Sequence, residues 1–480
     1  MWLCWLASCV SYGSPIAEPA EPVEGATMTA PALLGPLEPP AAPSSPLADP
    51  EGTPDSAEAA LPSALDPAND PGSTGAAPAD SAEIPQPGPA TETAAAPPGT
   101  PPPDLPLLGT SERPQLDPVA AASLELLDYL ALAGNLPLGL SRDDWDPTAG
   151  GGDVLGFVAD YRVAASGGTH TRVQAAISAA VAAGGNQRRY IELAAGTYRE
   201  VVCVPSGAPP ITLYGVEPDA TQTVIVFDNY AGKAKPAGTP GNPCNPNTAA
   251  TTYGTSGSAT LAVFARDFVA QNLSIVNDTD ERGASGSVQA PALLSQGDRV
   301  SYENVRVLGN QDTLLVKTPN VDTVTRAYFK SCYIEGDSEF ILGRGTLVLD
   351  GCTIHSLTSR LSGAVLAPST DARNPFGMLV TGSSFTADAA AQAASVALGR
   401  AWDENQTALA GYAALVSSGV YPNGQLLVRQ SVLGAHIQNV QPWRSALSTA
   451  RPFAAVAGDY PANRLYEFAN AGPGSASPQP

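Results

Sequence analysis

The chain has 480 residues and a formal net charge of −22, from 24 basic and 46 acidic side chains. Its first 112 residues hold 24 of the 47 prolines and 15 acidic residues but no Lys or Arg, so −15 of the charge falls there and −7 on the rest. A chain this acidic lacks the basic surface that nucleic acid or an anionic membrane surface requires, which excludes those partners.

The first nine residues are apolar and end in Leu6-Ala-Ser-Cys9. This ending is similar to the lipobox of a bacterial lipoprotein, in which Cys9 would be acylated and become the new N-terminus. The segment is short and has no basic residue before its apolar stretch, and a translation start placed too far downstream would explain both features. We expect residues 1–9 to be a lipoprotein signal and the protein to be exported, either to the outer membrane with a lipid anchor or as a secreted protein. The alternative is a chance apolar start.

Residues 10–112 are mostly Ala, Pro, Glu, Asp, Ser and Thr. Such a composition buries too little apolar surface to offset the loss of chain entropy on folding, so we expect a disordered, extended linker. The folded domain is then expected over residues 113–480, and we expect it to act as a monomer.

The first element of the domain that the pattern predicts is a helix over 169–181. Val173, Ile177 and Val181 recur at helical spacing, and Thr169 or Thr171 can cap the helix start. The end of a solenoid needs a cover, and this helix is a candidate to close the N-terminal end of the core.

A repeat follows, in which a short apolar strand meets a small or amide residue, here called the pivot, and a second apolar strand begins. The pivots are Asn272, Asn304, Ser331, Gly351, Gly382 and Gln430, at steps of 32, 27, 20, 31 and 48 residues. A fixed strand unit with variable insertions is typical of a solenoid. Because no helical pattern separates the copies, we predict an all-β fold, a right-handed parallel β-helix.

In such a helix the residue after each pivot should point inward and stack on its neighbours. These residues are Leu273, Val305, Cys332, Cys352, Ser383 and Ser431. Cys332 and Cys352 would then lie on neighbouring coils, as a buried thiol pair or, in an oxidising compartment, as a disulfide. Cys203 and Cys244 are candidates for a second bridge.

The cysteines show no CxxC spacing and the three histidines are scattered, so we expect no zinc site and no cofactor. Hydrolytic chemistry, if present, should rest on carboxylates.

Two carboxylates fall at the same place in the repeat. Asp312 lies eight residues after pivot Asn304, and Glu339 lies eight residues after pivot Ser331. If the two coils share a turn geometry, these acids sit about one strand spacing apart. Like charges so close resist joint ionisation, which lets one pair supply an acid together with a base or a nucleophile. The alternative is two solvated turn carboxylates.

Five segments in this order resemble the successive motifs of the pectinesterase family, which are carbohydrate esterases on a right-handed parallel β-helix. They are Gly196-Thr-Tyr-Arg-Glu200, Gln289-Ala290, Gly309-Asn-Gln-Asp-Thr-Leu314, Tyr333-Ile-Glu-Gly336 with Phe340-Ile-Leu-Gly343, and Leu398-Gly-Arg-Ala-Trp402. The tail segments Arg451-Pro-Phe and Asn463-Arg-Leu-Tyr-Glu-Phe resemble a bacterial lipoprotein branch of that family, some members of which are described as acyl-CoA thioesterases.

The resemblance implies roles for individual residues. Asp312 matches the general acid/base, and Glu339 occupies the position of the nucleophile. Gln289 and Gln311 match the glutamines that stabilise the oxyanion, a role that suits neutral amide donors. Arg400 matches the arginine that holds the nucleophile ionised, and Trp402 matches a platform for a sugar ring. Their ordinary alternatives are a structural ion pair for Arg400, core packing for Trp402 and coil capping for either glutamine.

Two departures from the family pattern affect the expected activity. Glu339 is one methylene longer than the usual Asp, so the site is rebuilt around a longer acid, Asp337 takes part, or activity is weak or absent. Ala401 replaces a proline between Gly-Arg and Trp, which leaves Arg400 and Trp402 in place. We therefore expect an enzyme that hydrolyses methyl esters of polygalacturonate (pectin) and releases methanol. The rivals are hydrolysis of another ester or an acyl-CoA thioester at the same site, and a catalytically impaired polysaccharide-binding lipoprotein.

Overall fold

The computed structural model describes residues 107–136, 138–244, 248–358, 363–402, 404, 424–443 and 462–476. The predicted signal 1–9, Cys9, almost all of the linker 10–112 and the tail segment 451–453 lie outside these residues. Within them, no helix has the length and apolar character needed to span a membrane.

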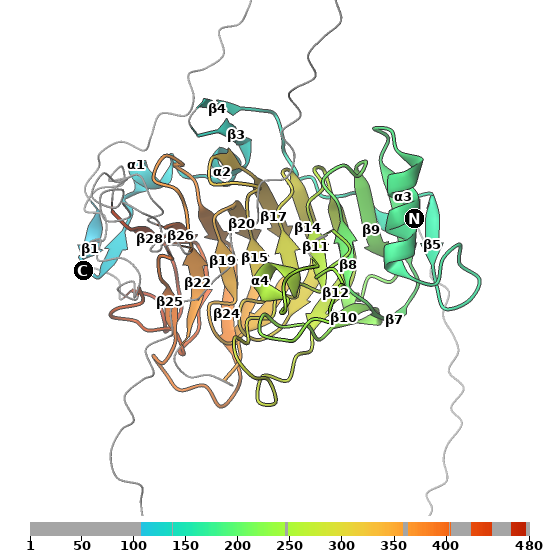
Figure 1. The fold of residues 1–480 in the computed structure, drawn as a ribbon. Coiled ribbons are helices and arrows are strands. Elements are labelled where there is room, and N and C mark those ends of the chain that lie inside the picture. The colour runs from blue at the N-terminus through green and yellow to red at the C-terminus, as the bar shows by residue number, and fades with distance from the viewer. Residues whose placement is uncertain are drawn as a thin grey trace, which may run out of the picture. The chain divides into compact units, whose positions relative to one another are not determined.

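Three columns of parallel strands form the body of the protein (Figure 1). Column A consists of β5 (Tyr161–Val163), β6 (Arg189–Leu193), β9 (Ile211–Gly215), β12 (Val269–Asn277), β14 (Val300–Leu308), β17 (Arg326–Lys330), β20 (Thr346–Asp350), β23 (Met378–Thr381), β26 (Gln425–Arg429) and β28 (Arg464–Phe468). Column B consists of β7 (Gly196–Arg199), β10 (Thr223–Phe227), the second halves of β12 and β14, β18 (Tyr333–Gly336), β21 (Thr353–Ser356), β24 (Ser384–Ala387) and β27 (Val432–Leu433). Column C consists of β8 (Val202–Val204), β11 (Leu261–Val263), β13 (Leu293–Ser295), β15 (Leu314–Val316), β19 (Ile341–Gly343), β22 (Ala364–Pro368) and β25 (Ala397–Gly399).

The chain passes through the columns in turn, so each circuit adds one coil to a parallel β-helix, as the repeat predicts. Strands β12 and β14 belong to two columns. The first half of β12 pairs with β9 and its second half with β10, because the strand bends at its pivot. The right-handed winding stays a prediction.

The pivots explain how a coil turns from column A to column B. All six have a positive φ, between 50° and 62°. Glycine reaches this left-handed region without strain, and asparagine reaches it more readily than most residues, which accounts for four of the six pivots. The side-chain amide of Asn304 also donates to the side-chain oxygen Oδ1 of Asn272 at 2.9 Å, which joins one turn to the next.

The predicted inward stack is confirmed, because each residue that follows a pivot is at most 2% exposed. The two buried serines accept backbone N–H groups: Ser383 Oγ from Cys352 at 3.0 Å and Ser431 Oγ from Ser383 at 3.1 Å. Cys332 and Cys352 are the buried thiol pair of the two alternatives, and both are free. Burial and the neighbouring thiol raise the pKa of Cys332 well above its ordinary value. Cys203 and Cys244 form a disulfide.

The predicted helix is present but begins later, as α3 (Val173–Ala183). Its cap is neither Thr169 nor Thr171: the carboxylate of Glu200 accepts the N–H groups of Val173 at 2.8 Å and Gln174 at 3.1 Å. Glu200 follows β7, so the cap comes from the solenoid, and the cap prediction was wrong for this reason. The apolar face of α3 joins the core cluster beside β5, β6 and β8. Its role as the cover of the core stays a prediction.

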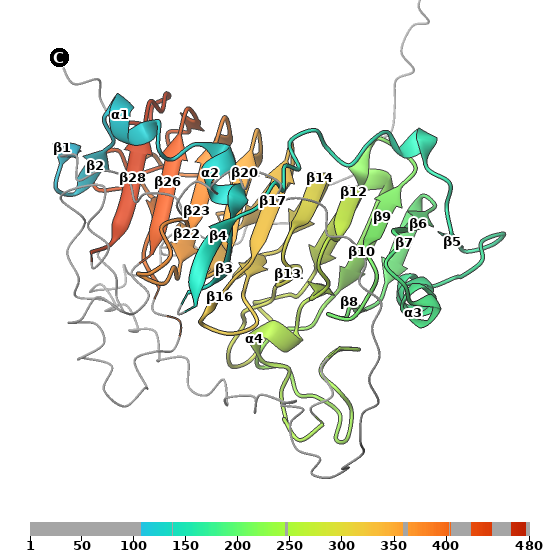
Figure 2. The same ribbon diagram turned by 90° about the horizontal axis from the view of Figure 1, so that it is seen from above.

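A segment that the sequence did not predict runs along column A. This N-terminal strap, residues 107–160, contains β1 (Leu108–Thr110), β2 (Arg113–Gln115), α1 (Pro118–Ala121), α2 (Leu126–Ala131), β3 (Leu132–Asn135), β4 (Gly139–Arg142) and η1 (Val154–Gly156). Strand β1 precedes the predicted boundary at 113 and pairs with β2. Figures 1 and 2 show the strap passing from β28 at one end of the column to β5 at the other.

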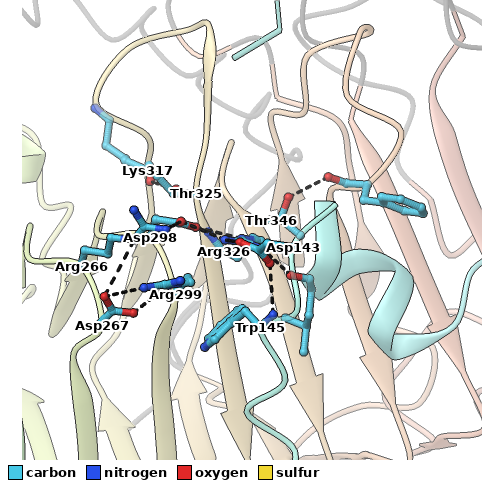
Figure 3. A network of polar contacts seen from close by, with 12 residues as sticks. Asp143, Trp145, Arg266, Asp267, Asp298, Arg299, Lys317, Thr325, Arg326 and Thr346 are labelled. Atoms are coloured by element: carbon cyan, nitrogen blue, oxygen red, sulfur yellow. Dashed lines mark hydrogen bonds and ion pairs between the residues drawn. The ribbon is translucent and has the colours of Figure 1, made fainter. Parts of the chain in front are cut away.

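The strap is held by contacts at several points of column A. It starts where β2 pairs with β28, and α2 lies on β17, β20 and β23, where a second apolar cluster forms. In the middle, the carboxylate of Asp143 pairs with Arg326, which also pairs with Asp298 and lies over the ring of Trp145 (Figure 3). At the far end Phe157 packs against Tyr190 and Tyr214.

The remaining described elements lie on the loops between strands. Strand β16 (Thr323–Val324) joins β3 in a small antiparallel sheet with β4, which fixes the loop between β15 and β17 to the strap. A short helix α4 (Gly254–Gly257) and the 3-10 turn η2 (Ala220–Gln222) complete the list of elements.

Candidate active site

The two predicted acids occupy equivalent turns on neighbouring coils. Asp312 lies two residues before β15 and Glu339 two residues before β19, and these strands pair with Leu314 opposite Ile341. Asp312 also donates its backbone N–H to the carbonyl of Ser338 at 3.3 Å. The 27-residue offset in the sequence is therefore one coil of the solenoid, and the acids lie in the same row.

Both acids have an unusual backbone conformation. Asp312 has a φ of 65° and Glu339 a φ of 49°. Residues other than glycine are uncommon in this region, and such conformations gather at functional sites because they carry a strain cost on the order of 1–3 kcal/mol. Their occurrence at equivalent positions of two coils indicates that one turn geometry aims both carboxylates.

Arg400 brings a positive charge to Glu339 from two coils away. It follows β25, and its backbone N–H donates to the carbonyl of Leu366 in β22 at 2.9 Å. Its Nε lies 2.5 Å from one oxygen of Glu339 and its Nη2 lies 2.6 Å from the other. This fork is the geometry of a charge-assisted bidentate pair. The longer acid fits the arginine with both oxygens, and its side chain remains 23% exposed.

Gln289 lies on the coil before that of Asp312, and Gln311 lies on the same coil as Asp312. The backbone N–H of Ala290, next to Gln289, donates to the carbonyl of Gln311 at 3.1 Å, so the glutamines belong to adjacent coils. Gln311 directly precedes Asp312. The Oε1 atom of Gln289 is buried and accepts no hydrogen bond from the residues that the structure describes. Buried amide groups are nearly always bonded, so a bound molecule is one way to satisfy this one.

Trp402 lies two residues beyond Arg400 on the same extended segment, and its backbone N–H donates to Pro368 at 2.9 Å. The half-buried ring packs against the apolar cluster on the outward face of column C. Ala401 is buried between them, and its carbonyl accepts a bond from Arg400 at 3.1 Å. The exchange of proline for alanine therefore leaves both neighbours in place.

Asp337 lies two residues before Glu339, so it does not occupy the turn position that Asp312 and Glu339 share. It is buried, and its backbone N–H donates to Asn310 at 3.2 Å, on the coil of Asp312. The row thus brings together Gln289, Gln311, Asp312, Glu339 and Arg400, with Asp337 at its edge.

Two acidic residues near the row were missed from the sequence. Glu281, on the loop after β12, accepts the backbone N–H of Gln311 at 3.1 Å. Glu404 is buried and pairs with Arg344 at 2.5 Å and Lys317 at 3.5 Å. The spacing could have indicated the two cations, because Lys317 lies five residues after Asp312 and Arg344 lies five residues after Glu339. No spacing indicates Glu281 or Glu404.

In the part of the chain that the structure describes, no group of three or more His, Cys, Asp or Glu side chains is arranged to hold a metal ion.

Comparison with known proteins agrees with this geometry. The family model described as Pectinesterase matches residues 160–427. A curated pectinesterase of Ralstonia solanacearum is 44% identical over 77% of this chain and 93% of its own length. YbhC of Escherichia coli, named as a candidate acyl-CoA thioester hydrolase, is 30% identical over 78% of this chain and 91% of its length.

Two solved structures are also similar to the fold. The crystal structure of YbhC superimposes with a TM-score of 0.64 at 27% identity and covers 76% of this chain and 96% of that one. The rice weevil pectin methyl esterase superimposes with a TM-score of 0.61 at 29% identity and covers 79% of this chain and all of that one. The five motifs, the row of acids and amides and these matches lead to one conclusion: the chain belongs to the pectinesterase family, whose members include YbhC.

Proposed function

We propose that this enzyme, a carboxylic ester hydrolase, removes methyl groups from the galacturonate esters of pectin and releases methanol. The observation that carries the proposal is the fork between Arg400 and Glu339 one coil away from Asp312, which separates the roles of two neighbouring acids. The 44% identity to a curated pectinesterase supports the choice of substrate.

The chemistry starts with Asp312 protonated and Glu339 ionised. An oxygen of Glu339 attacks the ester carbonyl, and the carbonyl oxygen takes up the electron pair beside the side-chain amides of Gln289 and Gln311. The methoxide leaves with the proton of Asp312 as methanol, and an acid anhydride joins the sugar to Glu339. Asp312 then accepts a proton from water, which attacks the anhydride and frees both carboxyl groups. Direct attack by water with Glu339 as the base gives the same products.

The half-buried ring of Trp402 is suited to stack on a sugar of the chain, because its segment is fixed by backbone bonds beside Arg400. Purified protein should therefore release methanol from highly methyl-esterified pectin. Absence of methanol from pectins of every degree of esterification would contradict the substrate assignment.

A second candidate function is hydrolysis of an acyl thioester, and the relationship to YbhC favours it. The same carboxylates would attack a thioester carbonyl. A panel of acyl-CoA substrates and synthetic esters, assayed beside pectin with the same protein, separates the two. A kcat/KM for any acyl-CoA that exceeds the value for pectin would replace the first proposal.

A third candidate is a polysaccharide-binding protein with impaired chemistry, which Glu339 in place of the usual Asp favours. Binding of oligogalacturonides without methanol release, and without repair in Glu339→Asp, would support it.

We also propose that the protein works outside the cytoplasm as a cell-envelope lipoprotein or a secreted monomer. The disulfide between Cys203 and Cys244 supports export, because such bonds persist in oxidising compartments. Loss of membrane association in Cys9→Ala would support the lipid anchor, and unchanged fractionation would argue against it.

A further inference from the structure

The disulfide between Cys203 and Cys244 fixes a long loop to the outward face of column C. This disulfide loop connects β10 with β11, and its described residues are 228–244 and 248–260. Cys203 lies in β8, 41 residues before Cys244, and both join the apolar cluster on that face. The loop is therefore fixed at a third point besides its two ends.

The same loop contacts the backbone of an expected oxyanion donor. The N–H of Ala231 donates to the carbonyl of Gln289 at 2.8 Å, and the N–H of Gly232 donates to the carbonyl of Ser287 at 2.7 Å. On the other side of Gln289, the next residue donates to the coil of Asp312. The backbone of this glutamine is thus held between the disulfide loop and the neighbouring coil.

Gly232 marks how closely the two segments approach each other. A Cβ atom at this position would lie 2.9 Å from the carbonyl oxygen of Ser285 and 2.9 Å from both the backbone nitrogen and oxygen of Ser287. No side chain fits there without moving one of the segments. Because packed segments without free space transmit displacements, a shift of the disulfide loop also shifts the segment that carries Gln289.

Hydrogen bonds within the loop connect the disulfide to this contact. The buried Lys235 donates its Nζ to the carbonyl of Thr239 and, at 3.4 Å, to that of Thr248. Its backbone N–H donates to the carbonyl of Thr251 at 2.8 Å. These bonds join the two sides of the loop, so the anchor at Cys244 restrains the segment around Ala231.

We propose that the disulfide between Cys203 and Cys244 positions Gln289 through this loop, so that full esterase activity requires the oxidised bond. The inference rests on the proposed function and on the role of Gln289 as an oxyanion donor. In the reduced protein the loop stays joined at its two ends but loses its third anchor. A displacement of the amide by around 1 Å is enough to cost on the order of a hundredfold in rate.

Reduction by a dithiol reagent converts the protein between the two states. One thiolate of the reagent attacks the sulfur of the half-buried Cys244, and Cys203 leaves and takes up a proton. The second thiol of the reagent then displaces Cys244, which also takes up a proton. The protein gains two thiols, and the reagent becomes a cyclic disulfide.

The first test measures methanol release by the full-length protein with and without a dithiol, at a temperature where circular dichroism shows both forms folded. Reduction should lower kcat about tenfold and change KM less than about twofold, because the amide acts on the transition state. Reoxidation should restore kcat. The matched control combines Cys203→Ala with Cys244→Ala. It should have the low kcat of the reduced protein and no response to the dithiol.

The second test asks whether the effect passes through the glutamine. Gln289→Ala should lower kcat about a hundredfold, as expected for loss of an oxyanion donor. In this background, removal of both cysteines should change kcat less than about twofold, because the group that they position is absent. A general structural role of the disulfide would instead lower kcat about tenfold in both backgrounds.

A third variant disturbs the same contact while the disulfide stays intact. Gly232→Ala should lower kcat about tenfold, and this loss should also disappear when Gln289 is alanine. The matched control is Gly283→Ala, in the loop that carries Gln289, because its Cβ would meet no atom closer than 3.3 Å. It should keep the wild-type kcat.

Unchanged kcat in the reduced protein, a change in KM alone, or losses that add to that of Gln289→Ala would overturn the inference. A response of the variant without Cys203 and Cys244 to the dithiol would assign the effect to other thiols and overturn it too. Absence of methanol release by the oxidised wild type would instead overturn the proposed function.

Discussion

Several arginines of this solenoid form forks with carboxylates, and two of them, Arg326 and Arg400, have different surroundings. Arg326, on column A, is fully buried; it pairs with Asp143 of the strap and with Asp298, and donates to the carbonyl of Leu130 at 2.7 Å (Figure 3). Arg400, after column C, forms the fork with Glu339 described above and is itself 11% exposed.

The difference shows how an arginine–carboxylate pair can have a structural role in one place and a chemical role in another. Arg326 is surrounded by two acids, a carbonyl and the ring of Trp145, so its bonding capacity is used within the protein and holds the strap to the coils. The pair of Arg400 and Glu339 leaves the acid open to a reactant. The surroundings of the arginine distinguish the two pairs, because Arg326 is 0% exposed and Arg400 11%. The carboxylates do not differ in this respect, since Asp143 is 28%, Asp298 20% and Glu339 23% exposed.

The largest expected effect comes from the structural arginine. Arg326→Met removes the buried cation that joins Asp143 to Asp298 and leaves Asp298 with the longer contact to Arg266 at 3.7 Å. Removal of one member of a buried pair costs about 3–5 kcal/mol. We expect the free energy of unfolding in urea to fall by this amount, while kcat per folded molecule stays at the wild-type value. A variant with wild-type stability and a lower kcat would show that Arg326 is not a structural residue alone.

The matched substitution in the site should do the reverse. Arg400→Met leaves Glu339 without its cation, so methanol release should fall at least about a hundredfold, as expected for loss of an electrostatic stabiliser. The free energy of unfolding should change by only about 1 kcal/mol, because both members of this pair keep contact with solvent, whereas Arg326 is fully buried. Unchanged kcat would show that this fork is also only structural.

A change in acid length sharpens the account of the reactive pair. Glu339→Asp withdraws the carboxylate by about 1 Å and weakens the two contacts to Arg400, so we expect kcat to fall about tenfold or more. Assays of initial methanol release check this. A higher kcat would instead show that the turn still suits the shorter acid and that glutamate degrades it.

The smallest effect is expected at an exposed pair. Asp322 and Arg373 lie 3.0 Å apart and are 40% and 33% exposed. Asp322→Asn should change the free energy of unfolding by less than about 0.5 kcal/mol and leave kcat unchanged. A larger effect would show that an exposed ion pair stabilises this protein as much as a buried one.

The sequence predicted what depends on repetition. The pivots set the register, and the register places Asp312 and Glu339 in one row, because residues at equal offsets from equivalent turns must stack. The family resemblance then supplied Arg400 and the two glutamines, which no spacing argument could reach.

The sequence did not predict contacts between distant segments. The strap carries no repeat, and its interaction with column A depends on side chains such as Asp143 and Arg326, which are 183 residues apart. The cap of α3 by Glu200 and the contact of Glu281 with Gln311 have the same origin. Each contact joins a loop to a coil at a distance that no local pattern encodes.

The paired-carboxylate account is tested most directly by the rate of methanol release from methyl-esterified pectin in Asp312→Asn. Asparagine tolerates the φ of 65° at this position, so the variant should fold with unchanged stability. The account predicts a loss of at least about a hundredfold relative to the wild type, since the proton donor is gone. Wild-type rates in the folded variant would contradict it.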